Sequence, residues 1–413
     1  MRGPEQTFQQ MLEDALFEVP YRIAVSVIAE KLSGQGIQLT EHDREQLAEH
    51  LKTSDGSAWS SPGAPGDECV RIEITESDTQ LIDQRVEQFM AENVPELVIT
   101  VGERIAEEVF PRLHETWGAE AEIQRVERCG FQERLSGRWG EAVGQLQMLL
   151  TVAREFGEFE GALLGGSEAS DSPVLAGVLL RLQARACQVT DEIIGLLCAG
   201  FSDGAMARWR TLHEIAAVAM LLKEQGESVA QRYVDHDVIE SARAARDYDE
   251  CCERLGYEPM DEVKLADLRR QHQAVVAKYG AGFDQPYGWA ADALGVKKPT
   301  LRDVRAAAGI DHMRSHYRMA SHNVHANPKG LFFKLGLLGD TDVLLAGPSN
   351  AGLSEPGQNA AISLTQVCSA LGTLQPTMDG LVVLHLMNRM TTDVCAAFHA
   401  AGEQLERDSE EEQ

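Results

Sequence analysis

Hydrophobic residues recur at helical spacing along most of this chain, and this pattern predicts a mainly all-α protein. Residues 6–33 place their apolar side chains on one helical face. A charged helix is expected after Thr40, because a threonine hydroxyl with Asp43 three residues later is typical of a helix N-cap. Residues 77–117 and 137–157 continue the helical pattern with many acidic side chains.

The C-terminal half is more regular and predicts a multi-helix bundle. A long apolar helix from Pro173 to Leu197 is expected to stop at Gly200, since glycine commonly follows the last turn of a helix. Further helices are predicted up to about Lys223, over 228–255, 260–279, 300–308 and 311–326, and in two closing segments.

Two segments depart from helical spacing and favour strands. LFFKLGL and DVLLAG, separated by LGDT, predict one small β-hairpin within residues 331–347, and CVRIEIT at 69–75 is a further strand candidate.

The pattern divides the chain into three parts. Residues 1–170 form a smaller, mostly helical N-terminal region with a flexible linker near 53–68, which is rich in Gly, Ser and Pro. Residues 171–405 form the helical bundle, and residues 406–413 are an acidic tail that we expect to be disordered.

The charge of the chain limits its partners. Its 37 Lys and Arg residues against 65 Asp and Glu residues give a net charge of −28, which disfavours broad contact with nucleic acid or an anionic membrane. No CxxC pair, signal-peptide pattern or run of about 18 apolar residues occurs, so we expect a cytoplasmic protein without a membrane span. No sequence signature indicates a cofactor or a metal.

One segment reverses the overall charge. Residues 296–334 contain eight Lys or Arg residues and two Asp residues, so this segment carries 8 − 2 = +6. Such a segment is typical either of a local phosphate-binding patch or of a basic surface that docks on an acidic helix or partner.

The candidate chemistry lies in the same segment. Along the helix predicted over 311–326, spacings of four and three place Arg318, His322 and His325 on one face, with Asn323 beside them. An arginine can bind a phosphate bidentately while an imidazole moves a proton, and this combination can cleave RNA without a metal. We therefore predict these four residues as catalytic. The alternatives are histidines in the helix interior, or a zinc site, which the lack of a nearby acidic or Cys ligand disfavours.

Further ligand contacts are predicted around this helix, from Arg314, Asn327 and Lys329. In an earlier helix Arg210 and Glu214 are four residues apart, and Glu214 could orient a histidine of the 311–326 helix. A purely structural ion pair is the alternative for these two residues.

Several separated motifs carry a family resemblance. The chain resembles the bacterial family named domain of unknown function 5677 over about residues 173–400, through LLCAGFSDGAMARWRTLHEIAAVAMLL, QRYVDHDVIES, DQPYGWAA and YRMASHNVHANPKGLFFKLG. The resemblance implies a shared helical domain and leaves the activity open.

More distantly, the bundle is similar to the higher-eukaryote-and-prokaryote nucleotide-binding (HEPN) superfamily, on the arginine-to-histidine spacing of Arg318 and His325. That similarity implies a homodimer of the toxin or phage-defence type that binds RNA or a nucleotide and cleaves RNA without metal. Met319 stands where a polar residue is usual in that superfamily. The alternative is a non-enzymatic helical scaffold or sensor that binds a partner protein.

Overall fold

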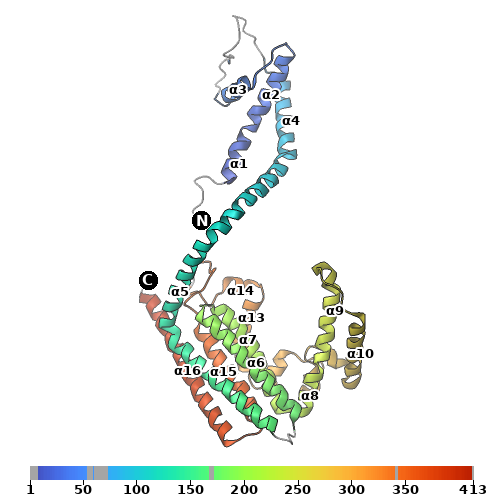
Figure 1. The fold of residues 1–413 in the computed structure, drawn as a ribbon, viewed down its shortest axis with the longest axis vertical. Helices are drawn as coiled ribbons and strands as arrows, with labels where there is room; N and C mark the ends of the chain where they lie inside the picture. The colour runs from blue at the N-terminus through green and yellow to red at the C-terminus, as the bar shows by residue number, and fades with distance from the viewer. Residues whose placement is uncertain (1–7, 54–58, 60–72, 167–171, 340–342, 412–413) are drawn as a thin grey trace. The chain divides into compact units, whose positions relative to one another are not determined.

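The computed structural model describes residues 8–53, 59, 73–166, 172–339 and 343–411, and these are helical with no strand among them (Figure 1). The predicted all-α class is confirmed. The predicted β-hairpin is wrong for the described residues, because its first segment begins in helix α14 (Pro328–Phe332) and the rest is irregular. Of the other strand candidate, residues 69–72 lie outside the described part, as does most of the predicted linker near 53–68.

The chain divides into two compact units, Met1–Ile123 and Gln124–Gln413. In the first unit, Val25, Ile28, Leu32 and Leu47 form a small core. Its helices are α1 (Phe8–Phe17), α2 (Val19–Ser33), α3 (Glu41–Thr53), α4 (Glu76–Glu92) and the start of α5 (Val94–Gly166).

Local sequence explains how two of these helices begin. The helix predicted over 6–33 is interrupted at Glu18, because Pro20 favours the first turn of a new helix and cannot donate a backbone hydrogen bond. At α3, the backbone N–H of Asp43 donates to the Thr40 hydroxyl at 3.2 Å, which confirms the predicted cap.

The second unit is built around α7 (Ser202–Gln225), which packs against α6 (Pro173–Cys198) and α15 (Ser354–Gly372). Trp209 and Leu212 of α7 are fully buried there. α16 (Met378–Glu411) packs on α15, and the C-terminal part of α5 adds Trp139 to the same core. The folded bundle thus includes residues that the sequence analysis placed in the N-terminal region.

The acidic tail was predicted to be disordered, but it is helical, because α16 continues through Glu411. The helix extends by regular hydrogen bonding from its buried part, and the hydroxyl of Ser409 in the tail donates to the carbonyl of Leu405, just before the tail, at 2.9 Å. Residues 412–413 lie outside the described part.

Several elements follow α7 in the chain, and of these α8, α12 and α13 pack against it. The helix predicted over 228–255 is two helices, with His236 between them. α9 and α10 lie side by side and extend from the bundle (Figure 1). The elements are α8 (Glu227–Asp235), α9 (Asp237–Leu255), α10 (Glu262–Tyr279), η1 (Ala281–Asp284), η2 (Gly288–Ala290), α11 (Ala291–Leu294), α12 (Leu301–Ala307), η3 (Asp311–Met313) and α13 (Arg314–Val324).

Candidate functional site

The predicted catalytic helix is shorter than expected. α13 ends at Val324, and His325 has an extended backbone with φ −110° and ψ 138°. Asn327 is also extended, as expected for a residue before Pro328, and its side-chain oxygen accepts from the Gly330 N–H at 3.0 Å to cap α14. The predicted common helical face therefore holds Arg318 and His322 but not His325.

The four predicted catalytic residues make no side-chain hydrogen bond or ion pair with one another among the described residues. Arg318 and His325 are exposed, and neither side chain makes a hydrogen bond or an ion pair among the described residues. His322 Nδ1 lies 3.1 Å from the amide nitrogen of Asn327. The side-chain amide of Asn323 is buried, and neither its nitrogen nor its oxygen has a partner among the described residues. Catalytic roles for these residues stay predictions.

The predicted outer ligands lie on the surface nearby. Arg314 and Lys329 are exposed, and the Lys329 ammonium lies 5.1 Å from the centre of the Phe333 ring. These side chains are accessible to a ligand in solution.

A different cluster forms where α13 packs on α7. The Tyr317 hydroxyl donates to Glu214 Oε1 at 2.5 Å, and Arg210 Nε lies 3.1 Å from the same oxygen and 2.6 Å from the Tyr317 oxygen. The predicted Arg210–Glu214 pair is thus present. The sequence pattern predicted that Glu214 orients a histidine of α13. In the structure Glu214 accepts from Tyr317 instead, because Tyr317 is the α13 residue that faces α7 here. Burial and the Glu214 carboxylate raise the pKa of Tyr317, which therefore stays protonated.

Arg305 of α12 completes this cluster and is the residue that we consider most informative. Its side chain is buried, with 7% exposed, and its guanidinium carbon lies 4.0 Å from the centre of the Tyr317 ring. Its Nε and Nη1 are buried and have no hydrogen-bond partner among the described residues. Burial lowers the pKa of this guanidinium, yet an arginine keeps its charge in proteins. The cluster therefore holds a buried cation with unused donors.

His213 lies against the same tyrosine. Its imidazole is 1% exposed, its centre is 5.9 Å from that of the Tyr317 ring, and neither ring nitrogen has a partner among the described residues. Burial, with the positive charges of Arg305 and His312, lowers the pKa of His213 to about 4. His213 is therefore neutral at pH 7, and its unprotonated ring nitrogen can accept a hydrogen bond.

Sequence reasoning missed Arg305, Tyr317 and His213 as members of a cluster. Arg305 was counted only as one charge of the basic segment, and Tyr317 opens the quoted YRMASHNVHAN run. The sequence gives little indication of this cluster, because the three residues are far apart in the chain and come together only when α12 and α13 pack on α7.

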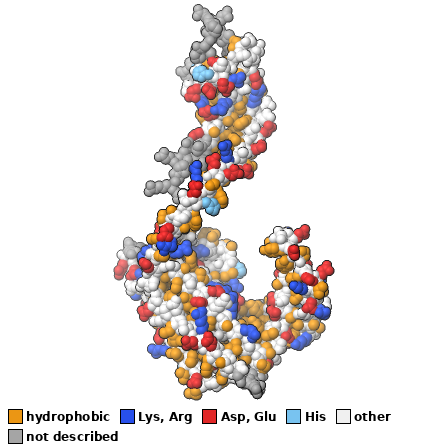
Figure 2. All heavy atoms as spheres, in the orientation of Figure 1, with side chains coloured by type: hydrophobic (Ala, Val, Ile, Leu, Met, Phe, Trp, Pro, Cys, Tyr) orange, Lys and Arg blue, Asp and Glu red, His pale blue; other side chains and the backbone are white. Residues whose placement is uncertain are grey.

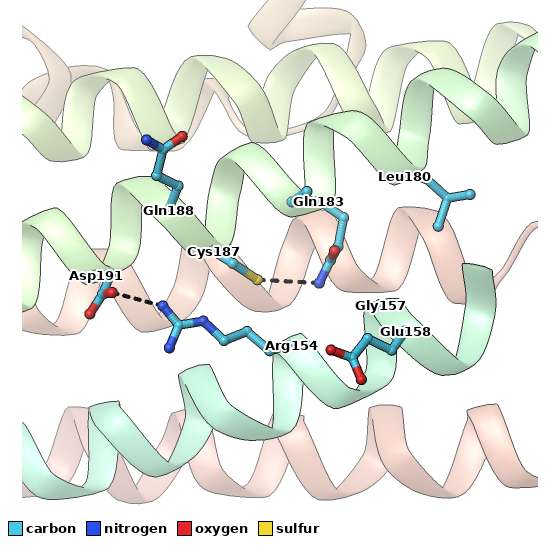
Figure 3. A pocket seen from close by; sticks show the side chains of 9 residues that line it. Arg154, Gly157, Glu158, Leu180, Gln183, Cys187, Gln188 and Asp191 are labelled. Carbon is cyan, nitrogen blue, oxygen red and sulfur yellow. Dashed lines mark hydrogen bonds and ion pairs between the residues drawn. The ribbon is translucent and has the colours of Figure 1, made fainter. Parts of the chain in front are cut away.

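A cavity of about 440 Å³ lies between α5 and α6, away from this cluster (Figure 3). Arg154 and Asp191 pair across it at 2.7 Å, and Gln183 donates to the Ala153 carbonyl at 2.6 Å. Burial raises the pKa of the Cys187 thiol in its wall to about 11, so this thiol is not a nucleophile at neutral pH. None of the predicted site residues lines this cavity.

Neither a metal cluster nor a membrane helix is found in the described ranges. No three His, Cys, Asp or Glu side chains there are grouped so that they could hold an ion. No helix there is long and apolar enough to span a bilayer.

Comparison with known proteins identifies one domain. Residues 176–342 match the model of a family of unknown function, DUF5677, and this range includes α7, α12 and α13 with their cluster. No curated protein and no solved structure matches the chain. Residues 176–342 therefore belong to the DUF5677 family, and the bundle carries its domain.

Proposed function

We propose that the helical bundle binds a phosphate group of RNA or of a nucleotide at the cluster of Arg210, Arg305 and Tyr317. The buried guanidinium of Arg305 supports this proposal most directly, because its Nε and Nη1 have no acceptor in the described part of the chain. Buried donors that lack acceptors cost free energy, and a phosphate oxygen can accept from both. Glu214 is already engaged by Arg210 and Tyr317, so it leaves these donors of Arg305 free.

The surrounding charge favours the same ligand. Arg314, Arg318 and Lys329 are exposed on the segment that carries +6, within a chain of −28. Local positive charge raises the concentration of a polyanion even on an acidic protein, and it makes binding dependent on salt.

The proposal extends to cleavage of the bound RNA without a metal, as in HEPN-like ribonucleases. The 2′-hydroxyl attacks the neighbouring phosphorus and gives up its proton, the bond to the 5′-oxygen breaks, and that oxygen takes up a proton. In this scheme Arg318 binds the phosphate that reacts, while another phosphate of the same RNA lies at Arg305. His325 exchanges a proton with the reacting oxygens, and His322 and Asn323 assist Arg318 and His325.

Binding is tested by fluorescence anisotropy with a labelled single-stranded RNA and by competition with ATP, at several salt concentrations. We expect Arg305→Met to weaken binding at least tenfold. Arg302→Met is the matched control, since Arg302 lies on the same helix, is exposed and carries the same charge. An equal loss of RNA affinity in both variants would mean that only the overall charge matters. No loss of affinity in either variant would refute the proposed site.

Cleavage is tested separately, by incubating RNA with the full chain in EDTA. We expect Arg318→Ala and His325→Ala to abolish cleavage while RNA binding through Arg305 persists. Equal cleavage by both variants and the unchanged protein would remove these residues from the mechanism. Binding without any cleavage would retain the binding site and reject the ribonuclease step.

A second candidate function, self-association as a scaffold, is favoured by the surface of the first unit. Its core is small, while the N-terminal part of α5 exposes large apolar side chains, which Figure 2 shows along this unit. They are Leu97, Val98, Ile99, Val101, Phe110, Leu113 and Trp117. Many large exposed apolar side chains on one helix are typical of an interface, and a second copy would offer the same side chains to a two-fold axis.

Light scattering of the full chain tests this scaffold proposal. We expect a dimer that Phe110→Glu converts to a monomer, because dimer formation would bury the new carboxylate in an apolar interface without water or a partner. Val263→Glu is the control, since Val263 is 78% exposed on α10 of the other unit. A monomeric unchanged protein, or a dimer that survives Phe110→Glu, would contradict this proposal.

A further inference from the structure

Two motifs of the sequence meet at a second cavity, of about 920 Å³, in the bundle domain. QRYVDHDVIES runs from α8 into α9, and DQPYGWAA forms the turn around η2. Each contributes several side chains to the lining, opposite the N-terminal turns of α6. Roughly 300–1,000 Å³ is the usual volume of a small-molecule site.

The cavity has aromatic walls. Tyr233, Tyr287 and Trp289 line it, and the Tyr233 and Trp289 rings are perpendicular, with centres 5.0 Å apart. Valine, leucine and proline side chains form much of the remaining wall. Such a surface offers π faces as well as apolar contact to a ligand.

Hydrogen bonds hold these aromatic residues in place. Arg232 Nε donates to the Trp289 carbonyl at 3.0 Å, and His236 Nε2 lies 2.9 Å from the Gln285 carbonyl, to which it can only donate. Gly288 is needed between them, because a Cβ there would lie 2.2 Å from the Phe283 carbonyl oxygen. The walls are therefore set before any ligand arrives, which reduces the entropy cost of binding.

The charges on the lining are mainly negative. Asp237, Glu240 and Arg181 are its Asp, Glu, Lys and Arg residues, so they give 1 − 2 = −1. Glu240 is paired with Arg243 at 2.8 Å and lies 3.7 Å from His236. Arg181 donates to the Gly177 carbonyl of its own helix at 2.7 Å. Asp237 has no ion pair among the described residues. The pKa of Tyr233 is raised by the burial of its own hydroxyl and by the negative charge of Asp237.

We infer that this cavity binds an organic cation, with a substituted ammonium group against the aromatic faces and an apolar or aromatic body in the remaining space. The π faces of Tyr233, Tyr287 and Trp289 attract a desolvated cation, and the Asp237 carboxylate balances its charge. This site is distinct from the proposed phosphate site, since neither Arg210 nor Arg305 lines it, but the charges of both residues act on Tyr287 in its wall.

The experiment uses benzyltrimethylammonium and its neutral isostere neopentylbenzene, titrated into the full chain by ligand-observed NMR. The two probes share size and shape and differ in charge. We expect the cation to bind saturably and about tenfold more tightly than the isostere, the ratio that a cation–π contact with a counter-charge provides.

Two variants and their controls localise the binding. Val234→Trp fills the cavity from an exposed wall position and should abolish binding, whereas Val263→Trp, on exposed α10, should not. Asp237→Asn should weaken the cation about tenfold and leave the isostere unchanged. Asp247→Asn, exposed on the same helix and outside the lining, should affect neither probe.

Three outcomes would overturn the inference: no saturable binding of the cation, equal affinity for the two probes, or unchanged binding in Val234→Trp. Asp237 is the first residue of α9, where a carboxylate also stabilises a helix. A thermal unfolding curve of each variant separates this effect, because a loss of cation affinity in a folded Asp237→Asn protein supports the site.

Discussion

Arg305→Met should stabilise the bundle while it weakens phosphate binding. Arg305 is 7% exposed, and its Nε and Nη1 have no partner among the described residues. Methionine fills most of the same volume without a charge or a donor, so it removes a desolvation cost from the folded state. A residue kept for stability would show the opposite sign.

The size of the effect follows from its parts. Each unpaired buried donor costs about 1–3 kcal/mol, so two donors cost about 2–6 kcal/mol. Against this, the contact of the guanidinium with the Tyr317 ring, at 4.0 Å, contributes about 1–2 kcal/mol that the variant loses. The thioether of methionine regains about 0.3–1.5 kcal/mol on the same ring. These terms add up to a net stabilisation of about 0.3–6.5 kcal/mol, with a midpoint of about 3 kcal/mol.

Calorimetry of the full chain measures this change in the unfolding transition of the bundle. Arg302→Met is the control and should change stability by less than about 0.5 kcal/mol, as for most surface substitutions. Adding pyrophosphate should raise the Tm of the unchanged protein and of Arg302→Met, because a ligand of the native state stabilises it, but not that of Arg305→Met.

A destabilisation of Arg305→Met by more than about 1 kcal/mol would refute this reasoning, since it would show that the guanidinium is satisfied within the protein. An equal pyrophosphate effect on Arg305→Met and the unchanged protein would separate Arg305 from the anion site.

Three further predictions concern buried groups. The pKa of His213 is about 4 in the folded protein against an ordinary 6.5, so the unfolded chain takes up its proton first and stability falls as pH drops from 6.5 to 4, by about 3 kcal/mol. His213→Leu should remove this decline in urea unfolding at pH 7 and pH 4.5, whereas His385→Gln, at an exposed position of α16, should keep it. Burial raises the pKa of Glu160, whose oxygens have no partner among the described residues. The folded protein is therefore destabilised as pH rises through that pKa, because the buried carboxyl must then ionise. Glu160→Gln should raise urea stability at pH 7 by about 1–3 kcal/mol and have less effect at pH 4.5. Gly288→Ala should lower urea stability by about 1–3 kcal/mol, because its Cβ would meet the Phe283 carbonyl.

Different results would contradict each of these. An unchanged pH dependence in His213→Leu would mean that the imidazole is solvated in the folded protein. A loss of stability in Glu160→Gln at pH 7 would indicate a partner for the carboxylate, and a neutral Gly288→Ala would show that the η2 turn relaxes easily.

The segment from Asn327 to Phe333 shows why some sequence predictions failed. Its run of Leu331, Phe332 and Phe333 favours a strand by composition. The structure begins a helix there instead, because the Asn327 side chain caps it and Pro328 fits its first turn. The same cap shortens α13 and leaves His325 outside the helical face on which it was predicted.

The sequence alone determined the features that depend on neighbouring residues. Helical periodicity predicted the all-α class and most helices, the Thr40–Asp43 cap was readable in four residues, and the +6 segment follows from composition. Periodicity tells which side chains share a face of one helix, since that depends only on the rise and turn of the backbone.

Only the tertiary structure decided which faces meet. It brought Tyr317 to Glu214, which lie 103 residues apart, and it buried Arg305, which the sequence presents as one of eight basic residues. It also joined QRYVDHDVIES and DQPYGWAA around one cavity. Such contacts depend on the packing of whole helices, where burial of apolar area selects the partners, and no local spacing encodes that choice.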